Sequence, residues 1–171
     1  MGKPVLYLMV GYPGAGKTTL AKIIAEATGA VHIWADKERH QMFKTPTHSH
    51  AESRKLYDHL NNIAAKLLAQ GKSAIFDTNF NFYKDREHLR RIALKNGAET
   101  VLIWVTTPKE LAQRRSVEHS HEQETRVWGN MPLADFQRLS GHLQPPHEDE
   151  QPITIDGTHI DPETVKQQLG L

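Results

Sequence analysis

The sequence predicts an α/β fold in which helices cover both faces of a parallel five-stranded sheet. Short apolar runs alternate with segments whose apolar residues recur at helical spacing, which is typical of strand–helix–strand units. The run at 100–105 is almost wholly apolar, as expected for a strand that is covered on both faces. Strands are expected at about 4–10, 31–35, 73–76, 100–105 and 152–155.

Helices are expected between and after these strands. The segment 51–70 places Leu56, Leu60 and Leu67 on one face and ends before Gly71, a typical helix terminator. Thr107-Pro108-Lys109-Glu110 has the pattern of a capping box with proline at the first helical position, which predicts a helix that begins there. The expected helices are 19–28, 51–70, 83–96, 107–117, 132–142 and 161–169.

Residues 11–18 read GYPGAGKT and match the phosphate-binding pattern G-x-x-x-x-G-K-[ST] without a gap. An apolar run precedes the match and a helical pattern follows it, which is the context that the motif requires. Glycines allow backbone N–H groups to face a phosphate chain, and the helix adds the positive end of its dipole. Lys17 can then reach the β- and γ-phosphates, and the Thr18 hydroxyl can bind Mg²⁺. The predicted nucleotide-binding residues are Gly11, Pro13, Gly14, Ala15, Gly16, Lys17, Thr18 and Thr19.

Composition sets limits on the class of protein. A length of 171 residues suits a single domain, and a net charge of +1 argues against binding along an extended nucleic acid. The chain has no cysteine, which excludes disulfides, thiolate metal sites and a cysteine nucleophile. The apolar run at the N-terminus is too short for a signal peptide or a membrane span, so we expect a cytoplasmic protein.

Two carboxylates follow predicted strands at the edge of the sheet where ligands bind in open α/β folds. Asp36 follows the second strand and could accept the proton of a hydroxyl that attacks the γ-phosphate, although an aspartate there is equally suited to cap a helix. Arg39, one helical turn later, could hold a substrate anion. Asp77 ends the third strand, where it could support Mg²⁺; the alternative is a turn that its side chain stabilises.

A polar stretch with several arginines follows the fourth strand, over residues 114–131. Arginines that close over a γ-phosphate stabilise the charge that spreads over its oxygens during transfer. We therefore expect a lid that carries Arg114, Arg115 and Arg126, with a solvated helix face as the alternative for any one of them. A second group of arginines, after the third strand, is expected at the surface: Arg86, Arg90 and Arg91.

Together these residues resemble the polynucleotide 5′-hydroxyl kinases and the wider group of small P-loop kinases, over about residues 7–146. The resemblance lies in the phosphate loop, in Asp36-x-x-Arg39 and in Asp77-Thr78-Asn79. It implies a three-layer P-loop NTPase fold with strand order 2-3-1-4-5 and ATP as the phosphate donor. It also implies that Asp36 is the general base and that Arg39 lies beside the attacked hydroxyl.

The same resemblance implies roles for residues outside these motifs. Lys17 and Arg126 would stabilise charge during transfer, and Arg114 and Arg126 would contact the ATP phosphates. Thr18 and Asp77 would hold Mg²⁺. On the substrate side the resemblance adds Asp77, Asn79 and Arg86.

We therefore expect one kinase domain over residues 1–171, with a lid at about 114–131, that transfers the γ-phosphate of ATP to an alcohol. The first choice of acceptor is the 5′-hydroxyl of a polynucleotide or nucleotide. The near-neutral charge favours the first alternative, a small-molecule kinase that acts on a sugar, nucleoside, antibiotic or nucleotide-sugar. The second alternative is a regulatory module that binds ATP without transfer. No protein partner is evident from the sequence.

Overall fold

The computed structural model describes residues 2–79, 82–119 and 129–171. Five strands form one parallel sheet in the order β2-β3-β1-β4-β5, which confirms the predicted fold class and strand order. The strands are β1 (Val5–Val10), β2 (Val31–Trp34), β3 (Ala74–Asp77), β4 (Glu99–Thr106) and β5 (Ile153–Asp156).

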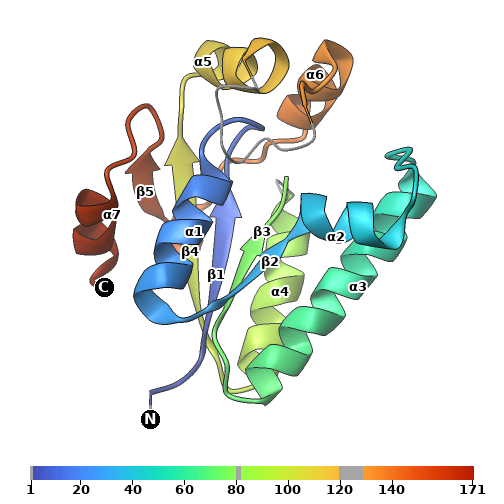
Figure 1. Ribbon diagram of the computed structural model, residues 1–171. Helices are drawn as coiled ribbons and strands as arrows, with labels where there is room; N and C mark the ends of the chain where they lie inside the picture. The colour runs from blue at the N-terminus through green and yellow to red at the C-terminus, as the bar shows by residue number, and fades with distance from the viewer. Residues whose placement is uncertain (1, 80–81, 120–128) are drawn as a thin grey trace.

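Different helices cover the two faces of the sheet (Figure 1). One face packs against α1 (Lys17–Thr28) and α7 (Pro162–Leu169), and the other against α3 (His50–Ala69) and α4 (Tyr83–Lys95). In the described ranges no helix is both long and apolar enough to cross a membrane.

The remaining helical segments are α2 (Ala35–Met42), α5 (Lys109–Gln113), the π-helix Arg114–Glu118, α6 (Leu133–Gly141) and the 3₁₀ turn Glu148–Glu150. α2 continues directly from β2, and the π-helix continues α5 without a break. The helices α2, α5 and α6 lie toward the carboxyl ends of the strands (Figure 1), whereas the 3₁₀ turn precedes the amino end of β5.

The central strand β1 contributes to two cores. Leu6, Leu8 and Val10 belong to the core under α3 and α4, whereas Tyr7 and Met9 belong to the core under α1 and α7. All five side chains are buried. Successive strand residues point to opposite faces, so a strand that is covered on both sides must be apolar throughout. The phosphate loop therefore extends from a strand that is fixed on both faces.

The predicted capping box at 107–110 is wrong. α5 begins at Lys109 after Pro108, and no side chain bonds its first backbone N–H groups. The Thr107 hydroxyl instead donates to the carbonyl oxygen of Ala15, at 2.8 Å. The end of β4 is thereby tied to the phosphate loop, a contact between segments that are far apart in the sequence.

Candidate active site

The phosphate loop joins β1 to α1 in a conformation that requires glycine. Gly14 and Gly16 have φ values of 80° and 114°, which side chains rarely adopt. A Cβ at Gly14 would also lie 2.3 Å from both the Ala112 carbonyl oxygen and the Ser116 Oγ. The loop therefore packs directly against α5 and the π-helix. No larger residue fits at Gly14 without moving one of these segments.

Lys17 is the first residue of α1 and is only 6% exposed. Its Nζ donates to the carbonyl oxygens of Gly11 and Tyr12, each at 2.8 Å. The ammonium group therefore lies against the inner side of the loop, close to the N-terminus of a 12-residue helix. Both features favour an anion at this place.

The loop opens into a cleft of about 290 Å³ at the carboxyl ends of the strands. Five segments contribute to it: the phosphate loop with the start of α1, the junction of β2 and α2, the end of β3, the π-helix, and the turn between β5 and α7. Asp36 and Asp77 thus face the same space as Lys17, as the sequence predicted. The lining residues are Pro13, Gly14, Gly16, Lys17, Thr18, Thr19, Trp34, Ala35, Asp36, Asp77, Thr78, Asn79, Arg115, Gly157, Thr158, His159 and Ile160.

Asp36 lies in the first turn of α2. The residue at the cap position of this helix is Trp34, whose side chain makes no capping bond, so Asp36 is not the helix cap. The backbone carbonyl of Asp36 accepts a bond from His40 Nδ1 at 2.8 Å. Asp36 is among the residues that line the cleft. This position suits a group that takes a proton from a bound hydroxyl.

The turn after β5 was not predicted as part of the site. A Cβ at Gly157 would lie 2.0 Å from Thr107 Oγ1 and 2.3 Å from the Ala15 carbonyl oxygen, so the turn packs closely on the phosphate loop. Ile160 similarly closes over Gly16, where a Cβ would be 2.5 Å from its Cδ1. The sequence did carry a signal, because this turn follows the carboxyl end of a predicted strand.

Arg115 lies on the π-helix and lines the cleft, whereas its neighbour Arg114 is exposed and does not. Arg115 donates to the carbonyl oxygens of Gly157 and Thr158, at 2.8 and 2.9 Å. The predicted contact of Arg114 with ATP is therefore not favoured by its position. Arg126 lies outside the described residues, as does half of the predicted lid, residues 120–128.

Arg39 does not line the cleft. It is 8% exposed, and its guanidinium donates to Glu52. Glu52 also accepts bonds from the backbone N–H and hydroxyl of Thr47 and from the backbone N–H of His48. Burial alone would raise the pKa of Glu52, but the hydrogen bonds from Thr47, Arg39 and His48 lower it to about 2. The ion pair fixes α2 to α3. The position of Arg39 outside the cleft lining does not favour its predicted contact with a substrate anion.

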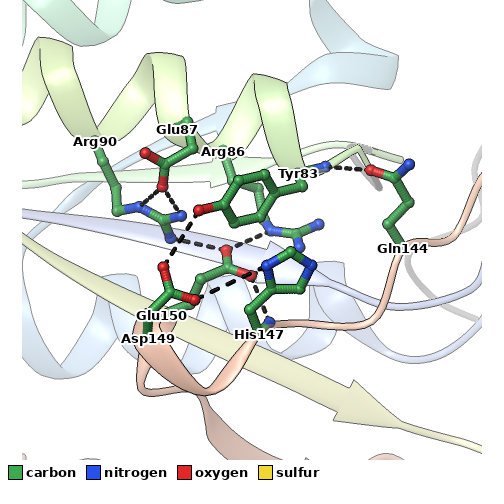
Figure 2. Close-up of polar contacts among 8 residues, drawn as sticks. All are labelled: Tyr83, Arg86, Glu87, Arg90, Gln144, His147, Asp149 and Glu150. Atoms are coloured by element: carbon green, nitrogen blue, oxygen red, sulfur yellow. Dashed lines mark hydrogen bonds and ion pairs between the residues drawn. The ribbon is translucent and has the colours of Figure 1, made fainter.

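Arg86 was predicted to be at the surface, and this is wrong. Its side chain is fully buried and donates from Nε and Nη2 to the two oxygens of Glu150, at 2.7 and 2.9 Å (Figure 2). Arg90 donates to the same carboxylate at 2.8 Å. Burial would raise the pKa of Glu150, but the bonds from Arg86, the His147 N–H and Arg90 lower it to about 2. Arg86 does not line the cleft, so its position does not support the implied role on the substrate side.

The residues around this ion pair join α4 to the segment 144–150 (Figure 2). The Tyr83 ring stacks on His147 with 4.2 Å between ring centroids, and its hydroxyl bonds Asp149 at 3.2 Å. The backbone N–H of Tyr83 donates to the Gln144 side chain at 2.7 Å. The start of α4 is thereby anchored to the chain that leaves α6.

The oxygen donors in the cleft fit Mg²⁺. Thr18 offers a hydroxyl and Asp77 a buried carboxylate, and both line the cleft beside the phosphate loop. Among the described residues no group of three or more histidines, cysteines or acids forms a closed metal cage. Mg²⁺ is usually bound by one or two protein oxygens together with water and substrate phosphates, so this donor set is sufficient for it.

The sequence of residues 6–146 matches the family described as AAA domain, and the chain belongs to this family. No curated protein matches the sequence. The family match spans the phosphate loop, both cleft carboxylates and the end of α6.

Solved structures share the fold over nearly the whole chain. A provisionally named kinase from Chloroflexus aurantiacus J-10-fl has 21% identity and a TM-score of 0.78, with 99% of this chain and 98% of that chain covered. The APS kinase CysC of Mycobacterium tuberculosis, solved with AMPPNP and APS, has 15% identity and a TM-score of 0.69, with 99% and 98% covered. A chain of the Pnkp1/Rnl/Hen1 RNA repair complex has 18% identity and a TM-score of 0.67, with 88% and 46% covered. At these identities the likeness shows the P-loop kinase fold alone.

Proposed function

We propose that the protein is an ATP-dependent kinase that transfers the γ-phosphate to a substrate hydroxyl. The observation that carries this proposal is the meeting of Lys17, Asp36 and Asp77 in one cleft. Nucleotide binding alone needs the phosphate loop, whereas transfer to an alcohol also needs a group that accepts the hydroxyl proton. Asp36, which lines the same cleft as the loop, supplies such a group.

Each residue then has a defined task. The acceptor hydroxyl gives its proton to the Asp36 carboxylate as its oxygen attacks the γ-phosphorus, and the bond to the β-phosphate oxygen breaks. Lys17 and the N-terminus of α1 stabilise the negative charge on the phosphates. Thr18 and Asp77 would hold Mg²⁺, which supplies further positive charge to the phosphate oxygens.

Arginines after β4 complete the proposal. Arg115 is already at the cleft, and we propose that it contacts the nucleotide phosphates. Arg126 keeps the role in charge stabilisation that the family resemblance implies, within a lid at about 114–131. An arginine supplied to the transferring group accelerates phosphoryl transfer because charge spreads over its equatorial oxygens.

For the acceptor we propose the 5′-hydroxyl of a polynucleotide or nucleotide, on the strength of the Asp36-x-x-Arg39 and Asp77-Thr78-Asn79 motifs. A small-molecule acceptor is the second candidate. It is favoured by the net charge of +1 and by the ion pair that holds Arg39 away from the cleft. Structural neighbours include proteins named for both kinds of substrate.

The test is transfer of labelled γ-phosphate from ATP-Mg²⁺ to a short 5′-hydroxyl oligonucleotide. We expect Asp36→Ala to lower kcat by about 10²–10⁴-fold with ATP affinity kept, which is the usual contribution of a general base. Lys17→Ala should weaken ATP binding, and Asp58→Ala, an exposed aspartate on α3, serves as the matched control. Normal turnover by Asp36→Ala would contradict the base assignment.

A salt titration separates the two kinds of acceptor. Binding of a nucleic-acid end should weaken as salt rises, because phosphate contacts release counterions, whereas a neutral metabolite should show almost no salt dependence. If ATP binds and neither an oligonucleotide nor a metabolite panel accepts the label, a regulatory module without transfer activity becomes the better description.

A further inference from the structure

The carboxylate of Asp77 is held by a residue outside the cleft. Asp77 is only 3% exposed, and its Oδ2 lies 2.8 Å from Nε2 of His32 on the neighbouring strand. An ionised carboxylate can only accept hydrogen bonds, so Nε2 of His32 carries the proton and donates it. One of the two oxygens of Asp77 is therefore engaged by the imidazole.

Strand register produces this contact. In the parallel pair β2–β3, His32 lies opposite Ile75 and Trp34 lies opposite Asp77. His32 and Asp77 are thus diagonal neighbours on the same face of the sheet, since side chains two residues apart along a strand share a face. Ile75 belongs to the core under α1, so the pair lies on the face of the helix that begins at Lys17.

The imidazole is in turn supported from the side. Its ring stacks on Trp34 with 5.7 Å between centroids and an angle of 10° between planes. Lys22 of α1 places its Nζ 5.7 Å from the centre of the Trp34 ring. A continuous set of contacts therefore runs from α1 through Trp34 and His32 to the carboxylate of Asp77.

Such support matters because a cation with strict geometry needs ligands with a fixed orientation. Mg²⁺ demands near-octahedral coordination, and a carboxylate that rotates freely loses conformational entropy when it binds the ion. Hydrogen bonds to a ligand from outside the coordination sphere remove this cost and are commonly worth about 10- to 100-fold in metal affinity.

We propose that His32 is a positioning residue for phosphoryl transfer, which holds the Asp77 carboxylate in the orientation that supports Mg²⁺ in the nucleotide complex. This inference rests on the proposed function, because it takes Asp77 to serve the metal. His32 itself is not among the residues that line the cleft, so we expect it to act through Asp77.

The test measures Mn²⁺ binding to the AMPPNP complex by electron paramagnetic resonance, which requires no turnover. His32→Phe keeps a ring to stack on Trp34 but cannot donate a bond, and we expect Mn²⁺ binding to weaken about 10- to 100-fold. His32→Gln retains an N–H donor and should restore most of the affinity. The matched control is His59→Phe, which removes a histidine–carboxylate contact, to Glu38, away from the cleft. It should bind Mn²⁺ as the parent protein does.

Further variants test whether His32 acts through Asp77. Asp77→Ala should weaken Mn²⁺ binding at least as much as His32→Phe, and the double variant should be no weaker than Asp77→Ala alone. Should His32→Phe fail to fold, His32→Asn, whose shorter side chain does not reach Asp77, is expected to give the same loss. Unchanged Mn²⁺ affinity in His32→Phe or His32→Asn, or in Asp77→Ala, would overturn the proposal.

Kinetics separate this inference from the proposed function. We expect His32→Phe to lower kcat and to raise the Mg²⁺ concentration needed for half-maximal rate, with little change in the KM for ATP. If the parent protein transfers phosphate and His32→Phe retains its Mn²⁺ affinity, the positioning role fails and the kinase proposal stands. If no acceptor is found while His32→Phe loses Mn²⁺, the positioning role stands and the kinase proposal fails.

Discussion

Arg86 and Arg115 both lie near the carboxyl ends of the strands, yet their surroundings are opposite. Arg86 is fully buried and its charge is matched by the carboxylate of Glu150. Arg115 is half-buried at the cleft, and its acceptors are carbonyl oxygens, which carry no formal charge. Burial lowers the pKa of Arg115 below its ordinary value, although Asp156 opposes this, and the guanidinium remains protonated at neutral pH.

This difference shows what allows an arginine to serve a phosphate. If a guanidinium leaves its buried carboxylate partner, the carboxylate remains behind as an unpaired buried charge, which is strongly destabilising. Arg39, held by Glu52, belongs with Arg86 in this respect. A guanidinium that is bound to carbonyl oxygens loses only neutral acceptors when a phosphate replaces them. The two kinds of arginine therefore differ in whether their hydrogen-bond acceptors are charged carboxylates or neutral carbonyl oxygens.

The largest expected effect lies on the Arg86 side. Glu150→Ala leaves a fully buried guanidinium without its carboxylate, and we expect the free energy of unfolding to fall by about 3–5 kcal/mol. Urea unfolding at neutral pH measures this change, with Glu87→Ala, which removes only the half-buried partner of Arg90, as the control. If Glu150→Ala were as stable as the parent protein but bound ATP less tightly, the contrast between a structural Arg86 and a phosphate-binding Arg115 would be wrong.

On the Arg115 side the effect should appear in binding. Arg115→Ala removes a charge-assisted contact worth about 1.5–3 kcal/mol, and we expect the Kd for ATP to rise by about 10- to 100-fold. Calorimetry with ATP measures the shift, and Arg114→Ala, which changes the exposed neighbour, is the matched control. A larger loss in Arg114→Ala than in Arg115→Ala would reverse our assignment and favour the family resemblance.

Low pH separates the two kinds of arginine further. Protonation of a carboxylate removes its ion pair with an arginine, whereas the bonds from Arg115 to carbonyl oxygens involve no acid. The folded pKa of Glu52 is about 2, below the ordinary 4.5, so its stabilising contribution is complete above pH 4.5 and is lost as pH falls toward 2. We therefore expect the difference in unfolding free energy between the parent protein and Glu52→Gln to be smaller at pH 3 than at pH 6. For Arg115→Ala the difference in unfolding free energy from the parent should be similar at the two pH values. If the difference for Glu52→Gln were also the same at pH 3 and pH 6, the low pKa of Glu52 would be contradicted.

The smallest effect concerns the contact behind the phosphate loop. Thr107→Val removes the hydroxyl that donates to Ala15, and we expect a loss of about 1 kcal/mol in unfolding free energy, the usual net value of such a bond. Thermal unfolding reads this loss, with Thr154→Val, at an exposed position of β5, as the control. If Thr107→Val were as stable as the parent protein, the hydrogen bond from Thr107 to Ala15 would not contribute to stability.

Features that depend on a few neighbouring residues were predictable from the sequence. GYPGAGKT carries its own turn and helix, and the side chains of Asp36 and Asp77 follow strands that local apolar runs reveal. Their meeting in one cleft follows from a parallel sheet, in which all carboxyl ends share an edge.

Features that depend on distant partners were not predictable. Nothing near Arg86 in the sequence announces Glu150, which lies 64 residues away. Thr107 has the local pattern of a helix cap, and only tertiary packing shows that its hydroxyl serves the phosphate loop. The place of Arg115 at the cleft likewise involves distant partners, because its guanidinium donates to the carbonyl oxygens of Gly157 and Thr158, more than 40 residues away.

Trp34 has a consequence for how the protein can be observed. Its indole lies in the cleft wall between Lys22 and His32, where an arriving nucleotide changes its surroundings. The chain has three tryptophans, and replacing Trp104 and Trp128 by phenylalanine leaves Trp34 as the single tryptophan. Occupancy of the cleft can then be followed as a change in intrinsic fluorescence, in real time and without a dye.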